Sequence, residues 1–490
     1  MSGLPKLLQT IKKYHPHADL EMVELAYDFA SEAHQGQKRL DGSDYISHPL
    51  ATAQKLAEMK LNAPIIIAGL LHDVPEETKV TLKEIEKNFG RDVASMVEGI
   101  TKLGNIKYRG IERYIENLRK MFIAMARDLR VIIIKFADRL HNLQTLEALP
   151  PHKRLRIAQE TLEIFSPIAN RLGIGELKGA LEDEAFRYVY PEEYKWVESL
   201  VKERLKKKEE YLKKVIKIVK SELTREGIKY ISIHGRTKHL FSLYKKLLKN
   251  ERDINRVYDL VAVRVVVKDL ADCYATLGII HKKWKPLKGR IKDYIAQPKP
   301  NGYRSLHTTV FCEDGEIIEI QIRTKEIHEE AEFGIAAHWQ YDESGKEPRL
   351  AARKEKWVEE LTRWQKEIQE NQKHLEELKI DVFQTRIFVF TPKGDVIDLP
   401  ENSTPVDFAY HVHTDLGNKC VGAMVNDQMA SLDTKLNNGD VVKILIDKNR
   451  QGPSPDWLNF VKTNLAKHKI RSQVKHDSKV KQILGKIWVK

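Results

Sequence analysis

Long hydrophobic runs, cysteine pairs and an apolar leader are all missing from this sequence. No segment approaches the roughly eighteen consecutive apolar residues that a membrane-spanning helix needs. The N-terminal stretch MSGLPKLLQTIKKYHPHADL lacks the apolar region of a signal peptide. We therefore expect a cytoplasmic protein that makes no membrane contact.

Cysteine is scarce, and acidic residues are outnumbered. Cys273, Cys312 and Cys420 lie far apart without CxxC spacing, which argues against a disulfide framework or a thiolate zinc site. The 83 Lys and Arg residues exceed the 70 Asp and Glu residues, for a net charge of +13. This excess favours phosphate-rich substrates or nucleic acid as partners, although a basic surface can also be unselective.

The length and pattern of the chain predict several soluble domains. With 490 residues, 42% hydrophobic and 31% charged, the chain has room for roughly three. Apolar residues recur at helical spacing from 17 to about 190, which predicts an all-helical domain. A charged amphipathic stretch follows and stops at Gly227, as a connecting helix would.

The second half of the chain changes its period. From about 229, segments such as KYISIHGR and YDLVAVRVVV alternate like strands, which predicts an α+β domain with a mainly antiparallel sheet. A charged stretch near 348–380 is expected to be helical. RIFVFTPKGDVIDLP is typical of a hairpin turned by Pro392-Lys393-Gly394, and it opens a small β-rich module.

Four side chains in the helical region suggest a metal site. His48 lies in DYISHPL, His72 and Asp73 adjoin in GLLHDVPEETKV, and Asp138 interrupts the apolar run of FADRLHN. Two imidazoles and two carboxylates form a donor set suited to Mn²⁺, Zn²⁺ or Fe²⁺. A carboxylate such as Asp138 is costly to bury unless a cation compensates it. A single histidine, however, is more often a structural residue.

Glu76 and Glu77 follow the His72-Asp73 pair by one helical turn. A carboxylate there could accept a proton from water activated at the metal, while its neighbour shapes the field or holds the water. The alternative is that both only complement the positive end of a helix that restarts at Pro75.

A second set of candidates surrounds a predicted strand-to-helix junction. The cations of HGRTKHLFSLYKKL that suit a triphosphate are Arg236, Lys238, His239, Lys245 and Lys246. In YDLVAVRVVV the alternation assigns Asp259 to one face of a central strand. A carboxylate on an otherwise apolar strand is a candidate Mg²⁺ ligand.

The stretch GRIKDYIAQPKPNGYRSLHTTVF interleaves cations with aromatic rings, a pattern that fits base stacking and phosphate neutralisation. Its candidate residues are Arg290, Lys292, Tyr294, Lys299, Asn301, Tyr303 and His307. Glu319 in EIIEIQIRT alternates with Gln321 and Arg323 and could deprotonate a ribose hydroxyl. Surface strands with ordinary charge alternation are the alternative.

Taken in order, ADRLHN, KDYIA, NGYRSLHTT, EIQIRT and AAHW resemble the RelA/SpoT (Rel) family of guanosine tetra- and pentaphosphate, (p)ppGpp, synthetase/hydrolases. VFTPKGDVIDLPENSTPVDFAYHVHTDLGNKCVGAMVN resembles the TGS module of that family. The resemblance covers nearly the whole chain. It implies a multidomain fold with an all-α HD hydrolase domain, an α+β synthetase domain with a mainly antiparallel sheet, and a small β-grasp-like TGS module. The implied boundaries are 1–195 for the hydrolase, 196–345 for the synthetase with its connector helix, 346–385 for a helical linker, 386–448 for the TGS module and 449–490 for the start of a basic helical region.

In the hydrolase, the resemblance implies removal of the 3′-pyrophosphate from (p)ppGpp, which returns GDP or GTP. The implied Mn²⁺ ligands are His48, His72, Asp73 and Asp138, with Glu76 and Glu77 activating water. The residues implied to lie near the nucleotide are Arg39, Asn142 and Thr145.

In the synthetase, the resemblance implies that Asp259 binds Mg²⁺ and that Glu319 deprotonates the 3′-hydroxyl of GDP or GTP. That hydroxyl would attack the β-phosphate of ATP and release AMP. Arg236 and Arg264 would sandwich adenine, and Tyr303 would stack on guanine. The residues implied to hold phosphates and ribose are Lys238, Lys246, Lys292, Lys299, Asn301 and His307.

The TGS module of long family members contacts uncharged tRNA on the ribosome. His411 and His413 in YHVHTD are candidates for that contact, or a structural pair. The RIKD string is the version typical of bifunctional members.

Two departures from the family pattern bear on hydrolysis. Leu40 and Asp41 replace a basic residue and a serine, and an acidic side chain there would repel the nucleotide. HDVPEET replaces the commoner HDVVEDT, which moves one carboxylate by a methylene. Three hypotheses result: a bifunctional enzyme, a synthetase whose HD domain is only regulatory, and a ribosome or tRNA adaptor with inactive sites. The presence of Asp138, Asp259 and Glu319 favours catalysis.

Overall fold

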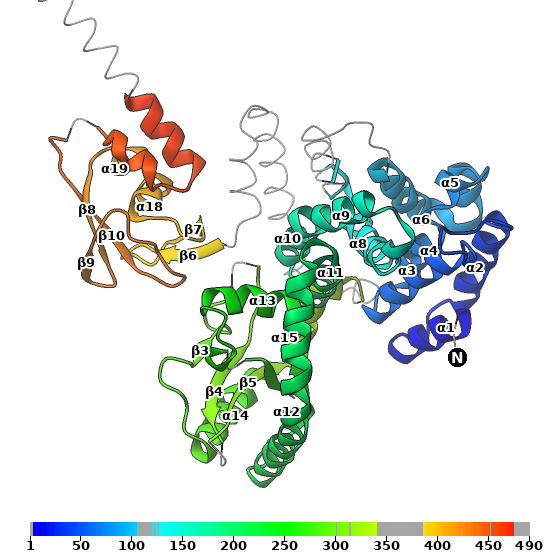
Figure 1. Cartoon of the computed structure of the whole chain (residues 1–490), viewed down its shortest axis with the longest axis horizontal. Coiled ribbons are helices and arrows are strands. Elements are labelled where there is room, and N and C mark those ends of the chain that lie inside the picture. Colours follow the sequence, from blue (N-terminus) through cyan, green and yellow to red (C-terminus); the bar gives the residue numbers. More distant parts are fainter. Residues whose placement is uncertain are drawn as a thin grey trace, which may run out of the picture. The chain divides into compact units, whose positions relative to one another are not determined.

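The structure is a computed structural model that describes residues 3–104, 120–121, 123–125, 127–257, 259–299, 301–312, 315–340, 386–450 and 452–474. The chain divides into two compact units, Met1–Lys366 and Glu367–Lys490 (Figure 1). No helix in the described ranges is long and apolar enough to cross a membrane.

The first part of the chain is a helical domain. Its elements are α1 (Leu4–Tyr14), α2 (Leu20–Ala33), α3 (Ser47–Glu58), α4 (Ala63–Leu71), α5 (Val74–Glu77), α6 (Leu82–Gly104), α8 (Leu129–Gln144), η1 (Leu146–Ala148), α9 (Pro151–Glu160), the π-helical turn η2 (Thr161–Phe165), α10 (Ser166–Arg171) and α11 (Gly175–Val189). The prediction of an all-helical domain is therefore confirmed over these residues.

Helix α4 forms the centre of this domain. Asn62 caps its start by accepting a hydrogen bond from Ile65 N, and Pro64 lies in its first turn. The sequence APIIIAGLL is apolar on every side, so the helix must be surrounded. It packs against α2, α3, α6 and α8. The His72-Asp73 pair, which follows the C-terminal end of α4, is thus attached to the most buried helix of the domain.

The break after α4 agrees with the restart predicted at Pro75. Helix α4 ends at Leu71, and α5 spans only Val74–Glu77 with Pro75 in its first turn. His72 and Asp73 keep helical backbone angles between the two helices. Both side chains are therefore carried on an almost continuous turn of backbone.

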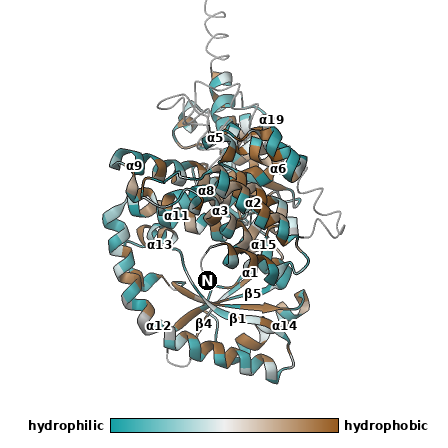
Figure 2. Ribbon diagram, turned by 90° about the vertical axis from the view of Figure 1, so that its right-hand side faces the viewer, coloured by the Kyte–Doolittle hydropathy of each residue, from teal (hydrophilic) through white to brown (hydrophobic). Residues whose placement is uncertain are grey.

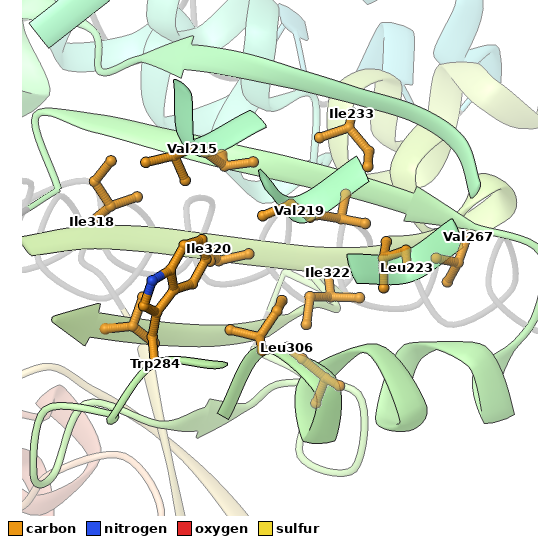
Figure 3. Close-up of a cluster of buried hydrophobic side chains, with 14 of the residues drawn as sticks. Val215, Val219, Leu223, Ile233, Val267, Trp284, Leu306, Ile318, Ile320 and Ile322 are labelled. Atoms are coloured by element: carbon orange, nitrogen blue, oxygen red, sulfur yellow. The ribbon is translucent and has the colours of Figure 1, made fainter. Parts of the chain in front are cut away.

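The predicted connecting helix is α12 (Pro191–Arg225), and it ends where the sequence indicated. Gly227 adopts a φ of +77°, which favours glycine, and the amide of Ile228 donates to the carbonyl of Leu223 at 2.9 Å. Near its C-terminal end, α12 buries Val215, Val219 and Leu223 against the following sheet (Figure 3). Each fully buried side chain of this size contributes about 1.5–3 kcal/mol.

The next region is an α+β domain built on a five-stranded sheet. The strands are β1 (Tyr230–Thr237), β2 (Val261–Val267), β3 (Lys292–Asp293), β4 (Leu306–Phe311) and β5 (Ile317–Thr324). Their order is β1-β2-β5-β4-β3, and only the β2–β5 pair is parallel, which confirms the mainly antiparallel prediction.

Helices enclose this sheet. They are α13 (Leu240–Lys249), η3 (Ile254–Arg256), α14 (Leu270–Lys283), α15 (Lys325–Phe333) and η4 (Gly334–Gln340). Helices α12 and α14 lie along the sheet (Figure 2), and buried apolar side chains of both helices and of the strands form one cluster. The other face of the sheet carries polar side chains, which line the cavity described below.

One strand assignment from the sequence was wrong. Asp259 was expected on a central strand, but β2 begins at Val261 and Asp259 lies in the turn before it. All seven residues of β2 are buried, including Arg264. A carboxylate with cationic partners is better accommodated at the strand entrance, where side chains reach the cavity.

The second unit contains a small β-rich module. Its elements are β6 (Arg386–Phe390), β7 (Val396–Pro400), α18 (Pro405–Val412), α19 (Thr414–Asn418), β8 (Cys420–Val425), β9 (Gln428–Ala430), β10 (Val442–Ile446) and η6 (Pro455–Asn459). Strands β6 and β7 form the predicted hairpin, with Gly394 at a φ of +91° in its turn. The β8, β9 and β10 strands form a second sheet in the order β10-β8-β9.

Residues after 448, where the module is predicted to end, pack against it. Trp457, Val461 and Ile470 are buried in one cluster with Val406 and Tyr410 of α18. Residues 464–474 are helical, and Ala466 and Ile470 are buried in the same cluster. The predicted linker 346–385 and the end of the tail, 475–490, lie outside the described residues.

Two candidate catalytic sites

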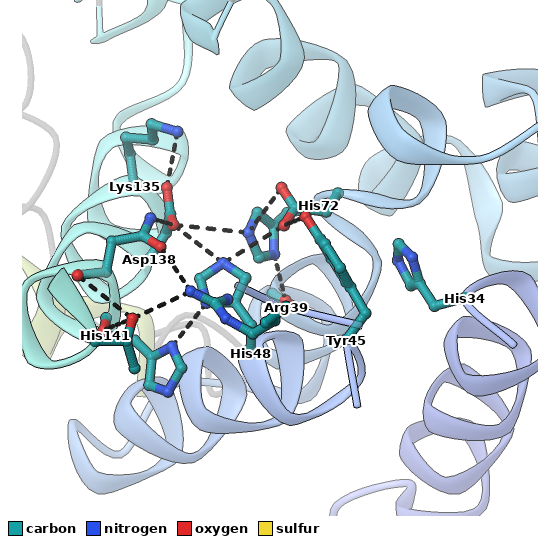
Figure 4. A network of polar contacts seen from close by, with 12 residues as sticks. His34, Arg39, Tyr45, His48, His72, Lys135, Asp138 and His141 are labelled. Carbon is teal, nitrogen blue, oxygen red and sulfur yellow. Dashed lines mark hydrogen bonds and ion pairs between the residues drawn. The ribbon is translucent and has the colours of Figure 1, made fainter. Parts of the chain in front are cut away.

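The predicted metal ligands meet between helices α3, α4 and α8. Asp138 Oδ1 lies 3.2 Å from His48 Nε2 and 3.9 Å from His72 Nε2 (Figure 4). Asp73 Oδ1 lies 3.2 Å from His72 Nε2, and its Oδ2 lies 3.4 Å from His48 Nε2. The ligand atoms of His48, His72 and Asp138 all fall within 4.8 Å of one another. The structure therefore gathers the four residues around one point.

Both histidines turn a ring nitrogen toward that point. His72 Nδ1 lies 2.8 Å from the carbonyl of Gly69 and must carry a proton to donate to it, so Nε2 keeps its lone pair. His72 Nε2 is buried and has no hydrogen-bond partner within the described part of the chain. His48 Nδ1 contacts His141 Nδ1 at 2.8 Å, which leaves His48 Nε2 facing the carboxylates. A buried, unpaired acceptor beside two carboxylates fits a divalent cation.

Burial and neighbouring charges keep the histidines neutral and Asp138 ionised, the forms that bind a cation. Burial lowers the pKa of His48, and burial is also the main cause that lowers the pKa of His141 to about 4, so both rings are neutral near pH 7. Burial alone would raise the pKa of Asp138, but Lys135 at 2.7 Å and the neighbouring imidazoles hold it well below its usual range. Asp138 is therefore ionised.

Glu76 and Glu77 stand on the short helix α5 beside this cluster. Burial raises the pKa of Glu76, with Lys135 opposing the shift and the charge of Asp73 adding to it. A carboxyl group with a raised pKa is a better proton acceptor than a fully solvated one. Glu77 holds the chain at the other end of α5, where its carbonyl accepts from the Gln37 amide at 2.8 Å.

The three residues assigned to the nucleotide lie together at the edge of the cluster. Arg39 Nη2 donates to Asn142 Oδ1 at 3.3 Å and to Thr145 Oγ1 at 3.1 Å. Leu40 and Asp41 follow in the same loop and are exposed. Hydrogen bonds from Ser43, its side chain first, lower the pKa of Asp41, so a negative charge stands close to Arg39.

Sequence reasoning missed three residues that support the ligands. Tyr45 donates to Asp73 Oδ2 at 3.0 Å, His141 pairs with His48, and Lys135 pairs with Asp138. Lys135 and His141 lie three residues to either side of Asp138, so a helical wheel drawn from that position could have found them. Tyr45 gave no signal, because its partner is 28 residues away.

The second site is a cavity of about 340 Å³ on the polar face of the sheet. Its walls come from the α10–α11 region, β1, α13, the turn before β2, the chain on either side of β3, β4, β5 and α15. The sequence-predicted residues that line it are Arg236, Lys238, His239, Lys246, Asp259, Arg290, Lys292, Tyr294, Lys299, Asn301, Tyr303, His307, Glu319, Gln321 and Arg323, whereas Lys245 does not line it and pairs with Glu182. The set is strongly cationic, as a site for phosphates requires.

Asp259 is the acidic centre at one end of the cavity. Lys238 Nζ lies 2.7 Å from its Oδ2, and Lys246 Nζ lies 2.6 Å from its Oδ1. Burial opposes ionisation, but these two ammonium groups lower the pKa of Asp259 to about 2. The carboxylate is thus permanently ionised and sits among cations, as in sites that bind a magnesium-nucleotide complex.

Glu319 lies on β5 at the other end. His307 Nδ1 is 2.8 Å and Gln321 Nε2 is 2.9 Å from its Oε1. The phenolic oxygen of Tyr303 is 2.8 Å from His307 Nε2, so ring, imidazole and carboxylate form a chain of hydrogen bonds. Burial would raise the pKa of Glu319, but His307 and Gln321 outweigh it and the net shift is downward. Glu319 is therefore available as a base near neutral pH.

Lys299 is held between two aromatic rings. Its Nζ lies 4.6 Å from the centre of the Tyr294 ring and 4.7 Å from that of Tyr303. Burial, followed by the charge of Lys292, lowers the pKa of Lys299 to about 8. Near pH 8 only part of the Lys299 population is protonated, and a bound phosphate would stabilise the protonated, charged form.

Arg264 does not reach this cavity, unlike Arg236. It is 4% exposed and its Nη1 is 3.0 Å from Glu332 Oε1 on α15. Its Nε and Nη2 are buried without a hydrogen-bond partner among the described residues. The arrangement expected for stacking adenine between Arg236 and Arg264 is therefore not formed in this structure.

The two candidate tRNA contacts behave differently. His413 caps α19, where its Nδ1 accepts from Asp415 N at 3.3 Å, and its side chain is 70% exposed. His411 Nδ1 lies 3.0 Å from the carbonyl of Asp407 within α18. Of this pair, only His413 exposes most of its side chain to solvent.

The chain thus combines a buried His/Asp cluster on helices with a cation-lined cavity on an α+β sheet. Three family models match the chain in that order: the HD domain over 26–175, the region found in RelA / SpoT proteins over 235–346, and the TGS domain over 387–446.

Relatives of known name agree with these matches. GTP pyrophosphokinase of Myxococcus xanthus is 44% identical over 97% of this chain and 63% of its own length. The guanosine-3′,5′-bis(diphosphate) 3′-pyrophosphohydrolase of Aquifex aeolicus is 46% identical over 96% and 66%. The bifunctional (p)ppGpp synthase/hydrolase SpoT of Escherichia coli is 44% identical over 96% and 67%. The chain belongs to the RelA/SpoT family, and it spans about two thirds or less of the length of these relatives.

Proposed function

We propose that this chain both makes and degrades (p)ppGpp. The observation that carries the proposal is that one chain holds two separate sites for phosphate chemistry. One is the buried cluster of His48, His72, Asp73 and Asp138, and the other is the cationic cavity that contains Glu319. Relatives that span this chain carry names for both activities.

The proposed synthetase reaction transfers pyrophosphate from ATP to the 3′-hydroxyl of GDP or GTP. Glu319 accepts the hydroxyl proton, and its contacts with His307 and Gln321 hold the receiving oxygen in place. The hydroxyl oxygen attacks the β-phosphate and AMP leaves. Lysines such as Lys238 and Lys246 neutralise the phosphates, so most of the catalysis comes from positioning and charge.

Asp259 is the proposed Mg²⁺ ligand of the synthetase. A bound Mg²⁺ would neutralise charge on the triphosphate of ATP. Asp259 is shared between Lys238 and Lys246 in this structure, so those ammonium groups would turn to the phosphates as the nucleotide binds. We also propose that the enzyme acts in the cytoplasm, where ATP and GTP are present.

The proposed hydrolase reaction releases pyrophosphate from the 3′ position of (p)ppGpp. The mixed nitrogen and carboxylate donor set, with the unpaired Nε2 of His72, suits Mn²⁺. A bound Mn²⁺ would activate water and stabilise charge on the phosphate. Glu76 takes the proton of the attacking water, Glu77 helps to hold that water, and Arg39 with Asn142 and Thr145 holds the nucleotide.

The C-terminal module supplies the proposed link to uncharged tRNA and the ribosome. His413 is the candidate contact, because an exposed imidazole can stack on or hydrogen-bond an unpaired base. Binding of a tRNA 3′ end that His413→Ala weakens, while His411→Ala does not, would support this assignment.

A synthetase with a regulatory HD domain is the second candidate. The observation that favours it is the ionised, exposed Asp41 next to Arg39, which opposes a polyanionic nucleotide. Thin-layer analysis of purified protein with ppGpp and Mn²⁺ distinguishes the two. Release of GDP and pyrophosphate supports the bifunctional enzyme, and intact ppGpp beside active (p)ppGpp synthesis supports the regulatory domain.

A further inference from the structure

The loop that joins α2 to α3 closes on itself and reaches the metal cluster from the side. We define the 37–45 loop as the residues from Gln37 to Tyr45. The amide of Tyr45 donates to the carbonyl of Gln37 at 3.1 Å, and the amide of Arg39 donates to the carbonyl of Ser43 at 2.9 Å. These bonds fix the loop ends against each other. The side chains at both ends are therefore presented as one unit.

Tyr45 connects this loop to a metal ligand. Its hydroxyl donates to Asp73 Oδ2 at 3.0 Å, while Asp73 Oδ1 faces His72 Nε2 at 3.2 Å. The Tyr45 ring stacks on His34, with ring centres 4.5 Å apart and planes at 17°, and His34 is 3% exposed. Figure 4 shows Tyr45 between His34 and the ligands. The phenol is thus held rigidly behind one carboxylate oxygen.

Gln37 connects the same loop to the far end of α5. Its Nε2 donates to the carbonyl of Glu77 at 2.8 Å, and its Oε1 lies 2.8 Å from His34 Nδ1. Helix α5 has four residues, so its own hydrogen bonds cannot hold it firmly. The contact with Gln37 therefore supplies an external support for the segment that carries Glu76 and Glu77.

We propose that the 37–45 loop is the positioning element of the hydrolase site. Tyr45 orients Asp73 for the cation, Gln37 holds the helix that carries the glutamates, and Arg39 on the same loop meets the nucleotide side. The inference rests on the proposed function of this site. Tyr45 and Gln37 are positioning residues, because each acts through another group.

The geometry gives the two residues different effects. Outer hydrogen bonds to metal ligands are worth about 10- to 100-fold in metal affinity. Removal of the Tyr45 hydroxyl should therefore weaken cation binding by about tenfold or more. Gln37 touches no ligand in the described structure, so its loss should lower the hydrolytic kcat and leave cation affinity within about twofold, since α5 moves but Asp73 stays bonded.

The test is calorimetric titration of the full chain with Mn²⁺, without nucleotide. The heat that His72→Ala abolishes defines the site. Tyr45→Phe keeps the stacked ring and removes only the hydroxyl. Tyr14→Phe is the matched control, because Tyr14 in α1 donates a partly buried hydrogen bond to the carbonyl of Leu61 at 2.6 Å and contacts none of the four metal-ligand candidates in the described structure.

Weaker Mn²⁺ binding by Tyr45→Phe, with wild-type binding by Tyr14→Phe and Gln37→Ala, supports the proposal. Equal binding by Tyr45→Phe and wild type overturns it, and the hydrolase assignment then stands. Loss of affinity in Tyr14→Phe as large as in Tyr45→Phe also overturns it, because the effect would then be one of stability. Absence of any titration that His72→Ala removes would overturn both this inference and the proposed metal-dependent hydrolase.

Discussion

The carboxylate of Glu332 holds two buried arginines, and its closest contact is Oε1 to Arg264 Nη1 at 3.0 Å. The same oxygen lies 3.4 Å from Arg323 Nη1, and Arg323 is completely buried. Burial would raise the pKa of Glu332, but the guanidinium groups of Arg264 and Arg323 outweigh it and lower that pKa. One carboxylate on α15 thus pairs with two buried guanidinium groups.

Glu332→Gln should destabilise the first unit of the protein. It leaves two buried guanidinium groups without a carboxylate, which typically costs about 3–5 kcal/mol. Denaturant unfolding measures the change. Glu330→Gln is the control on the same helix, because Glu330 pairs with the partly exposed Arg304 at 2.8 Å and its loss should cost about 1 kcal/mol or less. Equal costs for both variants would contradict the role given to Glu332.

Lys299 should make nucleotide binding sensitive to alkaline pH. Its pKa of about 8 means that the ammonium loses its proton as the pH rises through that value. A phosphate attracts only the charged form, so the KM for the guanine nucleotide should rise by up to about tenfold per pH unit above the pKa. Steady-state synthesis across this range gives the profile. Lys299→Arg stays charged and should flatten the rise, and an unchanged profile in that variant would refute the assignment.

Much of the fold followed from the sequence, because periodicity and stop signals are local. The end of α12 at Gly227 and the hairpin at Gly394 needed only neighbouring residues. The site was predictable as a set of residues but not as a geometry. Tyr45 and Asp73 meet through folding of distant segments, and Arg264 is diverted by Glu332 from α15. Alternation placed Asp259 on β2, although the strand starts two residues later.

Asp407 should control how the C-terminal segment of the second unit docks. It is fully buried and accepts hydrogen bonds from Lys462 N, Thr463 N and Thr463 Oγ1, with the Thr463 N bond at 2.8 Å. Asp407→Ala leaves those donors unpaired, at about 1–3 kcal/mol each if they stay buried. Limited trypsin digestion should then cut rapidly after Lys462 and Lys467. Asp433→Ala, at an exposed position of the same module, should leave the digestion unchanged.

Replacement of Asp41 in the 37–45 loop by serine, the residue usual in the family, should strengthen (p)ppGpp hydrolysis. Asp41 is exposed and ionised beside Arg39, so Asp41→Ser removes a repulsive charge from the nucleotide side of the site. The KM for ppGpp should fall by about fivefold, because a solvent-screened repulsion between two negative charges is removed. Asp44→Ser removes an exposed charge that is paired with Lys38 in the same loop and should change the KM much less. An equal fall in both would mean that only net charge matters.

The most direct test of two independent activities in one chain is a paired nucleotide assay of Asp138→Asn and Glu319→Gln. Each purified variant is given ATP with GDP under Mg²⁺, and separately ppGpp under Mn²⁺. The account predicts that Asp138→Asn makes ppGpp but fails to degrade it, and that Glu319→Gln degrades ppGpp but fails to make it. Loss of both activities in either variant, or loss of neither, would contradict it.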